Sequence, residues 1–163
     1  MKIGISGHQD LGSADKITWV REELRSQLDS RTFSSGVSSL AAGADQLFAH
    51  VVLELGHEIE VVIPCAEYET AFDDANAAKM FRQLKENAAR CYFLKFSAPS
   101  QEAFFAAGRR VVEISDMVFA VWDGKAAAGL GGTADVVKYA LKHSRQVLHI
   151  NPIAKTAHLL KDR

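Results

Sequence analysis

Short apolar runs alternate along this chain with stretches in which apolar residues recur every three or four positions. The short runs occupy residues 2–6, 34–39, 58–63, 91–96, 116–122 and 146–150. In several of them, such as Met117–Val121, successive residues are apolar, so both faces of the strand should be buried. The pattern therefore predicts parallel strands that are covered by helices on both sides.

The longer stretches between these runs have helical periodicity. Residues Ile17, Val20, Leu24 and Leu28 place one apolar stripe on a helix of about four turns. Further helices are expected over residues 44–55, 78–88, 99–114 and 133–143. Pro99 suits the first helical position of the fourth helix, and Gly56 suits the end of the second.

Strands and helices thus alternate, which predicts an α/β fold. We expect a Rossmann-like three-layer domain with a mainly parallel sheet of about six strands flanked by helices. Residues 1–163 are expected to form this single domain. Only residues 151–163 depart from the alternation, and we expect them to form a tail or a short terminal helix.

Composition restricts the classes of partner. The 163 residues include 19 Lys and Arg and 20 Asp and Glu, for a net charge of -1. Because no global field would attract polyanions, we expect a nucleotide-like small molecule as partner, with no nucleic acid and no membrane. No apolar run approaches the ~20 residues that span a bilayer, and the N-terminus lacks the apolar core of a signal peptide. A cytoplasmic location is expected.

The cysteines and most histidines give no sign of a metal or a redox site. Cys65 and Cys91 are far apart and outside any CxxC motif, which argues against a disulfide framework and against a cysteine zinc site. Cys65 has no evident histidine partner, so we expect a buried apolar residue and not a nucleophile. No metal-ligand spacing occurs among His50, His57, His143, His149 and His158. We expect neither a metal nor a cofactor.

The segment before the last predicted helix contains the strongest candidate for binding chemistry. Gly129, Gly131 and Gly132 directly precede Thr133, where that helix begins. Adjacent glycines let the backbone pass close to a ligand, and the N–H groups of a first helical turn bind anions. Thr133 either caps the helix or donates its hydroxyl to a phosphate. The alternative is a glycine-rich turn that only connects two elements.

Two further loops follow predicted strands at the same sheet edge. After the first strand, Gly7 and His8 follow an incomplete GxGxxG pattern, which makes a nicotinamide site a weak match. His8 either bonds a phosphate or sugar hydroxyl or orders its own loop by bonding Asp10. In the loop over residues 40–45, Gly43 would allow close approach to a ring or sugar. Asp45 either binds a ribose or only complements the helix dipole.

Other candidates lie further along the chain. Arg109 follows Gly108, and its planar guanidinium suits a phosphate, although an arginine in solvent is the alternative; Arg110 is expected in solvent. Tyr68 or Phe72 could stack on a base or only pack as part of a lid. Asp123, at the end of a buried strand, would bond a ribose or fix the glycine loop.

Taken together, several segments resemble the SLOG superfamily, which includes DprA and the LOG phosphoribohydrolases. The matching segments are Ser6–Leu11, Ser39–Asp45, Gly108–Arg109, Ser115–Asp116, Val121–Gly124 and Gly131–Val137. The resemblance spans nearly the whole chain and implies a bacterial Rossmann-like domain that binds a nucleotide or a nucleotide-derived ligand, including ADP-ribose-like ones. It matches Gly131, Gly132 and Thr133 to the phosphate-binding loop, and it implies a dimer by analogy.

The chain departs from the LOG pattern at one chemically important position. LOG enzymes carry the loop as PGGxGTxxE, and the final Glu takes part in cleaving the glycosidic bond. The equivalent position here is Val136, whose side chain can neither attack a sugar carbon nor accept a proton. Asp135 is adjacent, but on a helix it points about 100° away.

We therefore expect a sensor or binding module without a complete catalytic set. Its ligand-binding residues are predicted to be Gly7, His8, Gly43, Arg109, Asp123, Gly131, Gly132 and Thr133. A second hypothesis is an enzyme that hydrolyses or transfers an N-glycosidic bond, as phosphoribohydrolases and deoxyribosyltransferases do, with Asp135, Asp123 or Asp45 in place of the missing Glu. A third is a homo-oligomeric interaction module.

Overall fold

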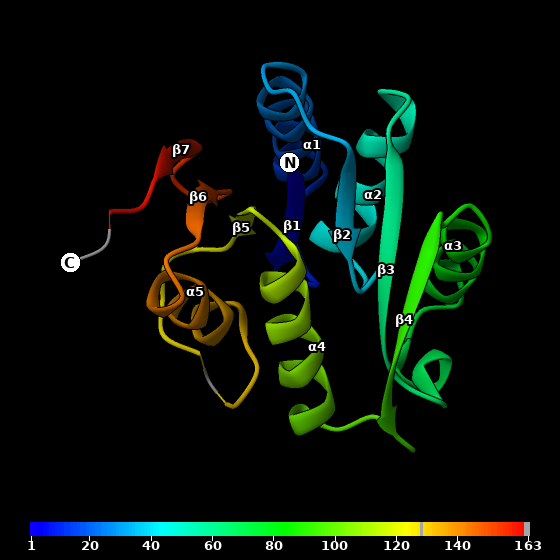
Figure 1. Cartoon of the computed structure of the whole chain (residues 1–163). Helices are drawn as coiled ribbons and strands as arrows, with labels where there is room; N and C mark the ends of the chain where they lie inside the picture. Colours follow the sequence, from blue (N-terminus) through cyan, green and yellow to red (C-terminus); the bar gives the residue numbers. More distant parts are fainter. Residues whose placement is uncertain (128, 162–163) are drawn as a thin grey trace.

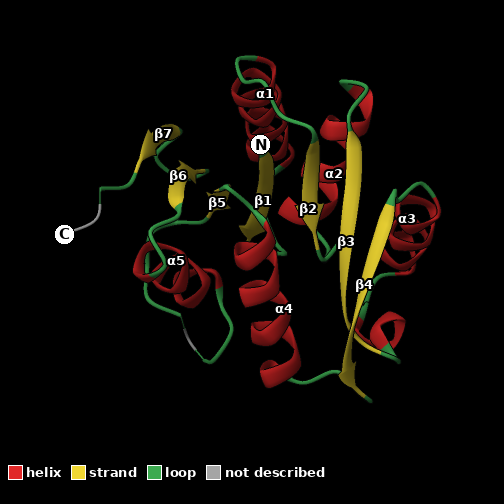
Figure 2. Ribbon diagram, in the orientation of Figure 1, coloured by secondary structure: helices red, strands yellow, loops and turns green. Residues whose placement is uncertain are grey.

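The computed structural model describes residues 1–127 and 129–161. They form an α/β domain in which strands and helices alternate along the chain (Figure 1; Figure 2). The strands are β1 (Lys2–Gly7), β2 (Ser35–Ser38), β3 (Glu58–Cys65), β4 (Arg90–Phe96), β5 (Met117–Val121), β6 (Gln146–Asn151) and β7 (Thr156–Leu159). The helices are α1 (Ala14–Asp29), α2 (Ala44–Glu54), α3 (Ala75–Glu86), α4 (Gln101–Ile114) and α5 (Thr133–Lys142), with a short 3-10 turn, η1 (Tyr68–Ala71).

The strands form one sheet in the order β4-β3-β2-β1-β5-β6-β7. All neighbouring pairs are parallel except β6 and β7. The chain moves outward from β1 to β4 and then returns to place β5 on the other side of β1. The strand order therefore reverses between β1 and β5, and in such sheets ligands bind beside the carboxyl ends of the strands at this switch point.

Helices cover both faces of the sheet. In Figure 1, α4 and α5 lie on one face and α1, α2 and α3 on the other. Ile3 and Ile5 of β1 are buried in the core beneath α1 and α2, whereas Val37 and Val62 pack with Val111 of α4. Burial on both faces explains why the strand sequences are apolar without alternation. The predicted Rossmann-like three-layer architecture is confirmed.

The expected terminal helix is wrong, because the tail adds a seventh strand to the sheet. Asn151 Oδ1 accepts hydrogen bonds from the N–H groups of Ile153, at 2.9 Å, and Ala154, at 3.0 Å. This turn reverses the chain, and Thr156 then pairs antiparallel with Asn151. Strand β7 thereby supplies hydrogen-bond partners to β6, which would otherwise be an open edge.

Two details of the helix ends also follow from local chemistry. Helix α4 begins at Gln101, two residues later than the Pro99 prediction requires, because Ser100 is the N-cap and its Oγ accepts from the N–H of Ala103 at 3.0 Å. Gly56 follows the end of α2 with φ +80°, as the predicted helix end requires. Across residues 1–127 and 129–161, none of the helices combines the length and apolarity that a membrane span needs.

The cysteines are free. Cys65 is 1% exposed, and burial raises the pKa of its thiol, which disfavours the nucleophilic thiolate. The prediction that Cys65 is a buried apolar residue is confirmed.

Candidate functional site

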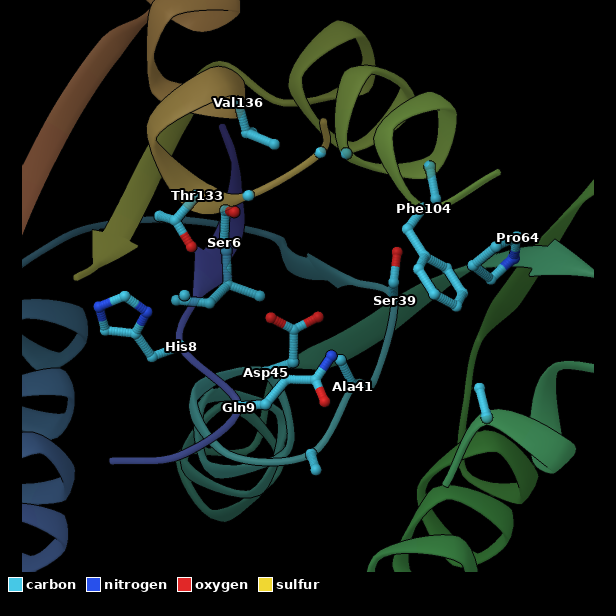
Figure 3. Close-up of a pocket in the computed structure, with 18 of the residues that line it drawn as sticks. Ser6, His8, Gln9, Ser39, Ala41, Asp45, Pro64, Phe104, Thr133 and Val136 are labelled. Carbon is cyan, nitrogen blue, oxygen red and sulfur yellow. The ribbon is translucent and has the colours of Figure 1, made fainter. Parts of the chain in front are cut away.

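A cavity of about 480 Å³ opens at the carboxyl edge of the sheet, beside the switch point between β1 and β5. Most of its lining comes from the end of β1 with the β1–α1 loop, the β2–α2 loop, η1 with the loop after it, helix α4, and the glycine turn with the start of α5 (Figure 3). Pro64 of β3 and Ala77 of α3 complete it. Its lining includes five residues that the sequence predicted for ligand binding: Gly7, His8, Gly131, Gly132 and Thr133.

The glycine turn before α5 leaves the first turn of that helix open to the cavity. Gly131 has φ +88°, and Gly132 is an N-cap that has no side chain to accept from the helix N–H groups. The N–H of Asp135 donates to the Gly132 carbonyl oxygen at 3.0 Å, whereas the N–H groups of Thr133 and Ala134 have no acceptor within the helix. Leu130 is 51% exposed and does not plug the turn. The Thr133 hydroxyl points into the cavity (Figure 3).

Asp135 stabilises this turn from outside the cavity. Its Oδ2 accepts a hydrogen bond from the N–H of Gly131 at 3.2 Å. The carboxylate does not line the cavity, which contains the neighbouring Val136 instead. The positions of the two side chains agree with the rotation of about 100° per residue on a helix.

Gly7 is the last residue of β1, and helix α2 and strand β5 both lie close to it. A Cβ at this position would lie 2.5 Å from the Ala44 Cβ and 2.9 Å from the Val121 carbonyl oxygen. Glycine therefore lets helix α2 and strand β5 approach β1 at the floor of the cavity.

Asp45 supplies a buried carboxylate to the cavity. The residue is 6% exposed, lies in the first turn of α2, and faces the cavity near Ser39 and Gln9 in Figure 3. Ser38 Oγ donates a hydrogen bond to its Oδ2 at 3.2 Å. Burial raises the pKa of Asp45 to about 7, although the Ser38 bond and the backbone of Ala41 and Ser39 act in the opposite direction. The carboxyl can thus change charge near neutral pH.

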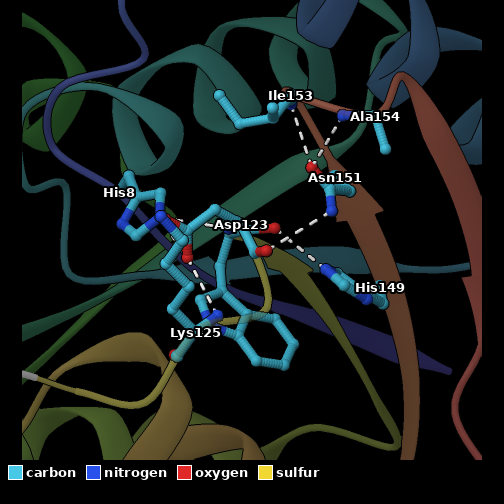
Figure 4. Close-up of polar contacts among 8 residues, drawn as sticks. His8, Asp123, Lys125, His149, Asn151, Ile153 and Ala154 are labelled. Carbon is cyan, nitrogen blue, oxygen red and sulfur yellow. Dashed lines mark hydrogen bonds and ion pairs between the residues drawn. The ribbon is translucent and has the colours of Figure 1, made fainter.

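Two histidines hold the peptide bond between Trp122 and Asp123 from opposite sides (Figure 4). The N–H of Asp123 donates to His8 Nε2 at 3.1 Å, and His149 Nε2 lies 2.9 Å from the Trp122 carbonyl oxygen, to which it donates. Since His8 Nε2 accepts, the neutral ring carries its proton on Nδ1. His8 therefore has a ring N–H left for the cavity, while its other nitrogen anchors the β5–α5 loop.

The alternative in which His8 bonds Asp10 is wrong. Asp10 Oδ1 accepts instead from the N–H of Gly12 at 2.8 Å, which orders the β1–α1 loop without the histidine. Long-range pairing with Asp123 depends on the adjacency of β1 and β5, and sequence spacing does not reveal it.

The Asp123 side chain fixes its own loop. Its Oδ1 accepts from the N–H of Lys125 at 3.0 Å, and this bond is the main cause of the lowered pKa of Asp123. His8 Nε2 lies 3.5 Å from the same oxygen. Asp123 is not part of the cavity lining, so its geometry matches the loop-fixing alternative more closely than ribose binding.

Two other predicted site residues also lie outside the lining. Gly43 packs against the backbone carbonyl groups of His8 and Gln9, where it lets the β2–α2 loop touch the β1–α1 loop. Arg109 is exposed, and its guanidinium lies 5.1 Å from the centre of the Phe105 ring. The sequence could not distinguish this stacking from phosphate binding because the direction of the side chain depends on how α4 packs.

Several lining residues were not singled out from the sequence: Ser6, Gln9, Ser39, Asp73, Asp74 and Phe104. One sequence signal could have indicated Phe104. It lies four residues before Gly108, so the two share one face of α4. Asp10, Asp45, Asp73 and Asp74 contribute carboxylates to the cavity, and the described lining includes no Lys or Arg.

The sequence resemblance aligns Val136 with the LOG glutamate. Val136 is 2% exposed and packs against Gly108, where a Cβ would lie 2.7 Å from Val136 Cγ2. The close contact between α4 and α5 is thus made by the apolar side chain of Val136 against Gly108. Across the two described ranges, no three His, Cys, Asp or Glu side chains are arranged to hold a metal ion.

No protein-family model matches the chain, and no curated protein matches it either. Solved structures do. DNA processing protein A from Helicobacter pylori matches 91% of this chain with a TM-score of 0.68 and 19% identity. DprA from Streptococcus pneumoniae matches 91% with a TM-score of 0.63 and 17% identity. The chain spans 64% and 49% of the length of these two proteins.

A molybdenum cofactor binding protein from Rippkaea orientalis matches as well, over 92% of this chain and 76% of its own, with a TM-score of 0.58 and 15% identity. At these identities the likeness concerns the fold. It confirms the Rossmann-type fold, shared with DprA, that the sequence resemblance implied.

The expectation of no nucleic-acid partner is wrong. The H. pylori protein is described by its mode of binding single-stranded DNA, and it shares this fold. Net charge was an insufficient criterion, because a surface can bind a polyanion locally while the whole chain is close to neutral.

Proposed function

We propose that this chain, a DprA- and LOG-like Rossmann-type domain, binds a nucleotide or a nucleotide-derived ligand in the cavity beside β1 and β5. One observation carries the proposal. The end of β1 at Gly7 and the glycine turn before α5 converge on one cavity, and the first turn of α5 opens onto it without a capping side chain. Backbone N–H groups and the helix dipole favour an anion at this end.

The rest of the cavity suits the remainder of a nucleotide. Its volume of about 480 Å³ is typical of small-molecule sites. Aromatic and small apolar side chains from η1, from Phe72 after it and from α4, including Tyr68 and Phe104, offer a surface for a base. The ring N–H of His8 is a further donor for a phosphate oxygen. The phosphate would therefore lie toward α5 and the base toward η1.

The lining supports binding without cleavage. Of the three carboxylates considered as substitutes for the missing Glu, only Asp45 lines the cavity; Asp123 and Asp135 bond their own loops. We expect AMP to be recovered unchanged after long incubation with the protein, as measured by chromatography. Release of adenine that is absent from a heat-denatured control would instead favour the N-glycosidic-bond enzyme.

The acidic lining favours a ligand with few charges. Asp10, Asp73 and Asp74 surround a cavity to which no lysine or arginine contributes among the described lining residues. Each additional phosphate near these carboxylates is unfavourable by on the order of 1 kcal/mol. We expect calorimetric titration to give AMP an affinity at least about fivefold higher than ATP. Tighter binding of ATP than of AMP would contradict this assignment of charge.

Thr133 allows a test of the phosphate end. Thr133→Val keeps the shape of the side chain but removes the hydroxyl that points into the cavity. We expect affinity for AMP to fall by about five- to tenfold, the effect of one lost hydrogen bond to a charged group. Thr18→Val is the matched control, since Thr18 is exposed on α1 and does not line the cavity. An unchanged affinity of Thr133→Val would place the phosphate elsewhere.

The second candidate function is binding of single-stranded DNA. It is favoured by the fold shared with the H. pylori protein, which is described as binding single-stranded DNA. A fluorescent oligothymidylate, followed by anisotropy with and without AMP, tests it. Binding that AMP displaces would assign the strand to the same cavity, and binding that AMP leaves unchanged would assign it to another surface.

A further inference from the structure

We infer that Asp45 determines the sugar specificity of the cavity: its carboxylate accepts a hydrogen bond from a ribose hydroxyl, so the site selects ribonucleotides over nucleotides that lack the 2′ and 3′ hydroxyls. This inference rests on the proposed function and adds to it the class of sugar and the residue that recognises it.

The position of Asp45 along the cavity is the first step. In Figure 3, Asp45 lies between the end marked by Thr133 and His8 and the end marked by Phe104 and Pro64. The first end offers helix N–H groups and a hydroxyl, and the second offers apolar surface. In a nucleotide the sugar lies between the phosphate and the base. A ligand with its phosphate at α5 would therefore present its sugar to Asp45.

The chemistry of the carboxylate is the second step. Asp45 is 6% exposed, and among the described residues Ser38 is the one side chain that donates to it, at 3.2 Å. The backbone of Ala41 and of Ser39 also donates to this carboxylate. A carboxylate has about four acceptor positions, so these three donors leave one toward the cavity. A buried carboxylate is costly unless donors satisfy it. A sugar hydroxyl is such a donor, whereas the oxygens of an ionised phosphate are not.

The rigidity of the residue is the third step. Asp45 belongs to the first turn of α2, and Ala44 beside it donates its N–H to the His8 carbonyl oxygen at 3.1 Å. The Ser38 hydroxyl that donates to Asp45 also accepts from the N–H of Leu40 at 2.9 Å. The carboxylate is thus held in place before a ligand arrives, as discrimination between similar ligands requires.

The rival role for Asp45 is to order the β2–α2 loop through Ser38. Asp45→Asn separates the two roles, because an amide oxygen still accepts from Ser38 while the negative charge is lost. A purely structural role would change the affinity for every nucleotide by the same factor. A role in sugar recognition would change only the preference between nucleotides with and without hydroxyls.

The experiment is calorimetric titration of the whole chain with AMP and with 2′,3′-dideoxyadenosine monophosphate. We expect the wild-type protein to prefer AMP by about 10-fold or more, since a hydrogen bond to a charged acceptor contributes roughly 1.5–3 kcal/mol. In Asp45→Asn we expect the preference to fall below about threefold, with the affinity for the dideoxy compound within about twofold of wild type. Asp29→Asn is the matched control, because Asp29 is exposed at the end of α1 and does not line the cavity, and this variant should keep the full preference.

The outcomes separate the two proposals. Equal affinity of the wild-type protein for AMP and the dideoxy compound would overturn the inference and leave nucleotide binding intact. A preference that survives in Asp45→Asn would also overturn it and assign Asp45 to the loop. Failure of the wild-type protein to bind AMP, ATP or the dideoxy compound would overturn both.

Discussion

Gly43→Ala is expected to lower the free energy of unfolding by about 3–4 kcal/mol. Two causes add. Gly43 has φ +82°, a backbone conformation that other residues adopt only at a cost. A Cβ there would also lie 2.5 Å from the carbonyl oxygen of His8 and closer still to that of Gln9. Both contacts involve backbone, so no side chain can rotate away, and the two loops beside the cavity would have to separate.

Gly56→Ala is the matched control for this prediction. Gly56 has nearly the same φ, +80°, but nothing lies within 4 Å of a Cβ placed on it. Its replacement should therefore cost only the conformational part, about 1 kcal/mol. Urea denaturation followed by circular dichroism measures both variants. Equal losses for the two would show that contact between the β1–α1 and β2–α2 loops contributes little.

The second large effect is a pH-dependent stabilisation by Asp45→Asn. Burial raises the pKa of Asp45 from 3.8 to about 7, so between these values the folded state holds a proton that the unfolded state has released. Stability in the wild-type protein therefore falls as pH rises through this window, by about 1.4 kcal/mol per pH unit, and is constant above it. Asparagine has no such penalty.

We expect the advantage of Asp45→Asn over wild type to grow by about 2–3 kcal/mol between pH 5 and pH 8. The variant is compared with wild type at each pH because other groups titrate in the opposite sense. Burial lowers the pKa of His149, for example, so its contribution is lost as pH falls below the usual histidine range. The exposed Asp73→Asn should differ from wild type by less than about 0.5 kcal/mol at both pH values. A pH-independent difference for Asp45→Asn would show that the carboxyl is hydrated in the folded protein.

The fold was predictable because its signals are periodic and local. Uninterrupted apolar runs such as Met117–Val121 occur where helices cover both faces, and the strands were located to within two residues of their observed ends. The tail was not predictable in the same way. Strand β7 is short and mostly exposed, and it forms because β6 offers an edge, which is a property of the assembled sheet.

The parts of the cavity that are formed by backbone could be predicted from the sequence, whereas the parts that are formed by side chains were harder to predict. The presence of Gly7 and of Gly131 to Thr133 in the lining was predictable, because loops that follow parallel strands meet at one edge of the sheet. Arg109 and Asp123 have suitable chemistry, but one stacks on Phe105 and the other bonds its own loop. The directions of these two side chains depend on packing, which residue spacing does not reveal. For Asp45 the sequence offered a purely local role at the helix dipole, yet its side chain faces the cavity.

The Trp122–Asp123 peptide bond shows how the site is tied to the sheet. Its N–H is held by His8 of the β1–α1 loop and its carbonyl oxygen by His149 of β6. The start of the glycine-containing β5–α5 loop is thereby anchored to two other segments. These two hydrogen bonds hold the start of the loop in place, while the turn at Gly131 and Gly132 stays open to the cavity.

The most direct test is an amide-resolved NMR titration of isotopically labelled protein with AMP. If backbone N–H groups bind the phosphate, the largest chemical-shift changes should occur at Gly7, Gly132 and Thr133, while Gly56, which does not line the cavity, should not move. Shifts that are absent at millimolar AMP, or that are confined to residues outside the cavity, would contradict the assignment of this cavity as a nucleotide site.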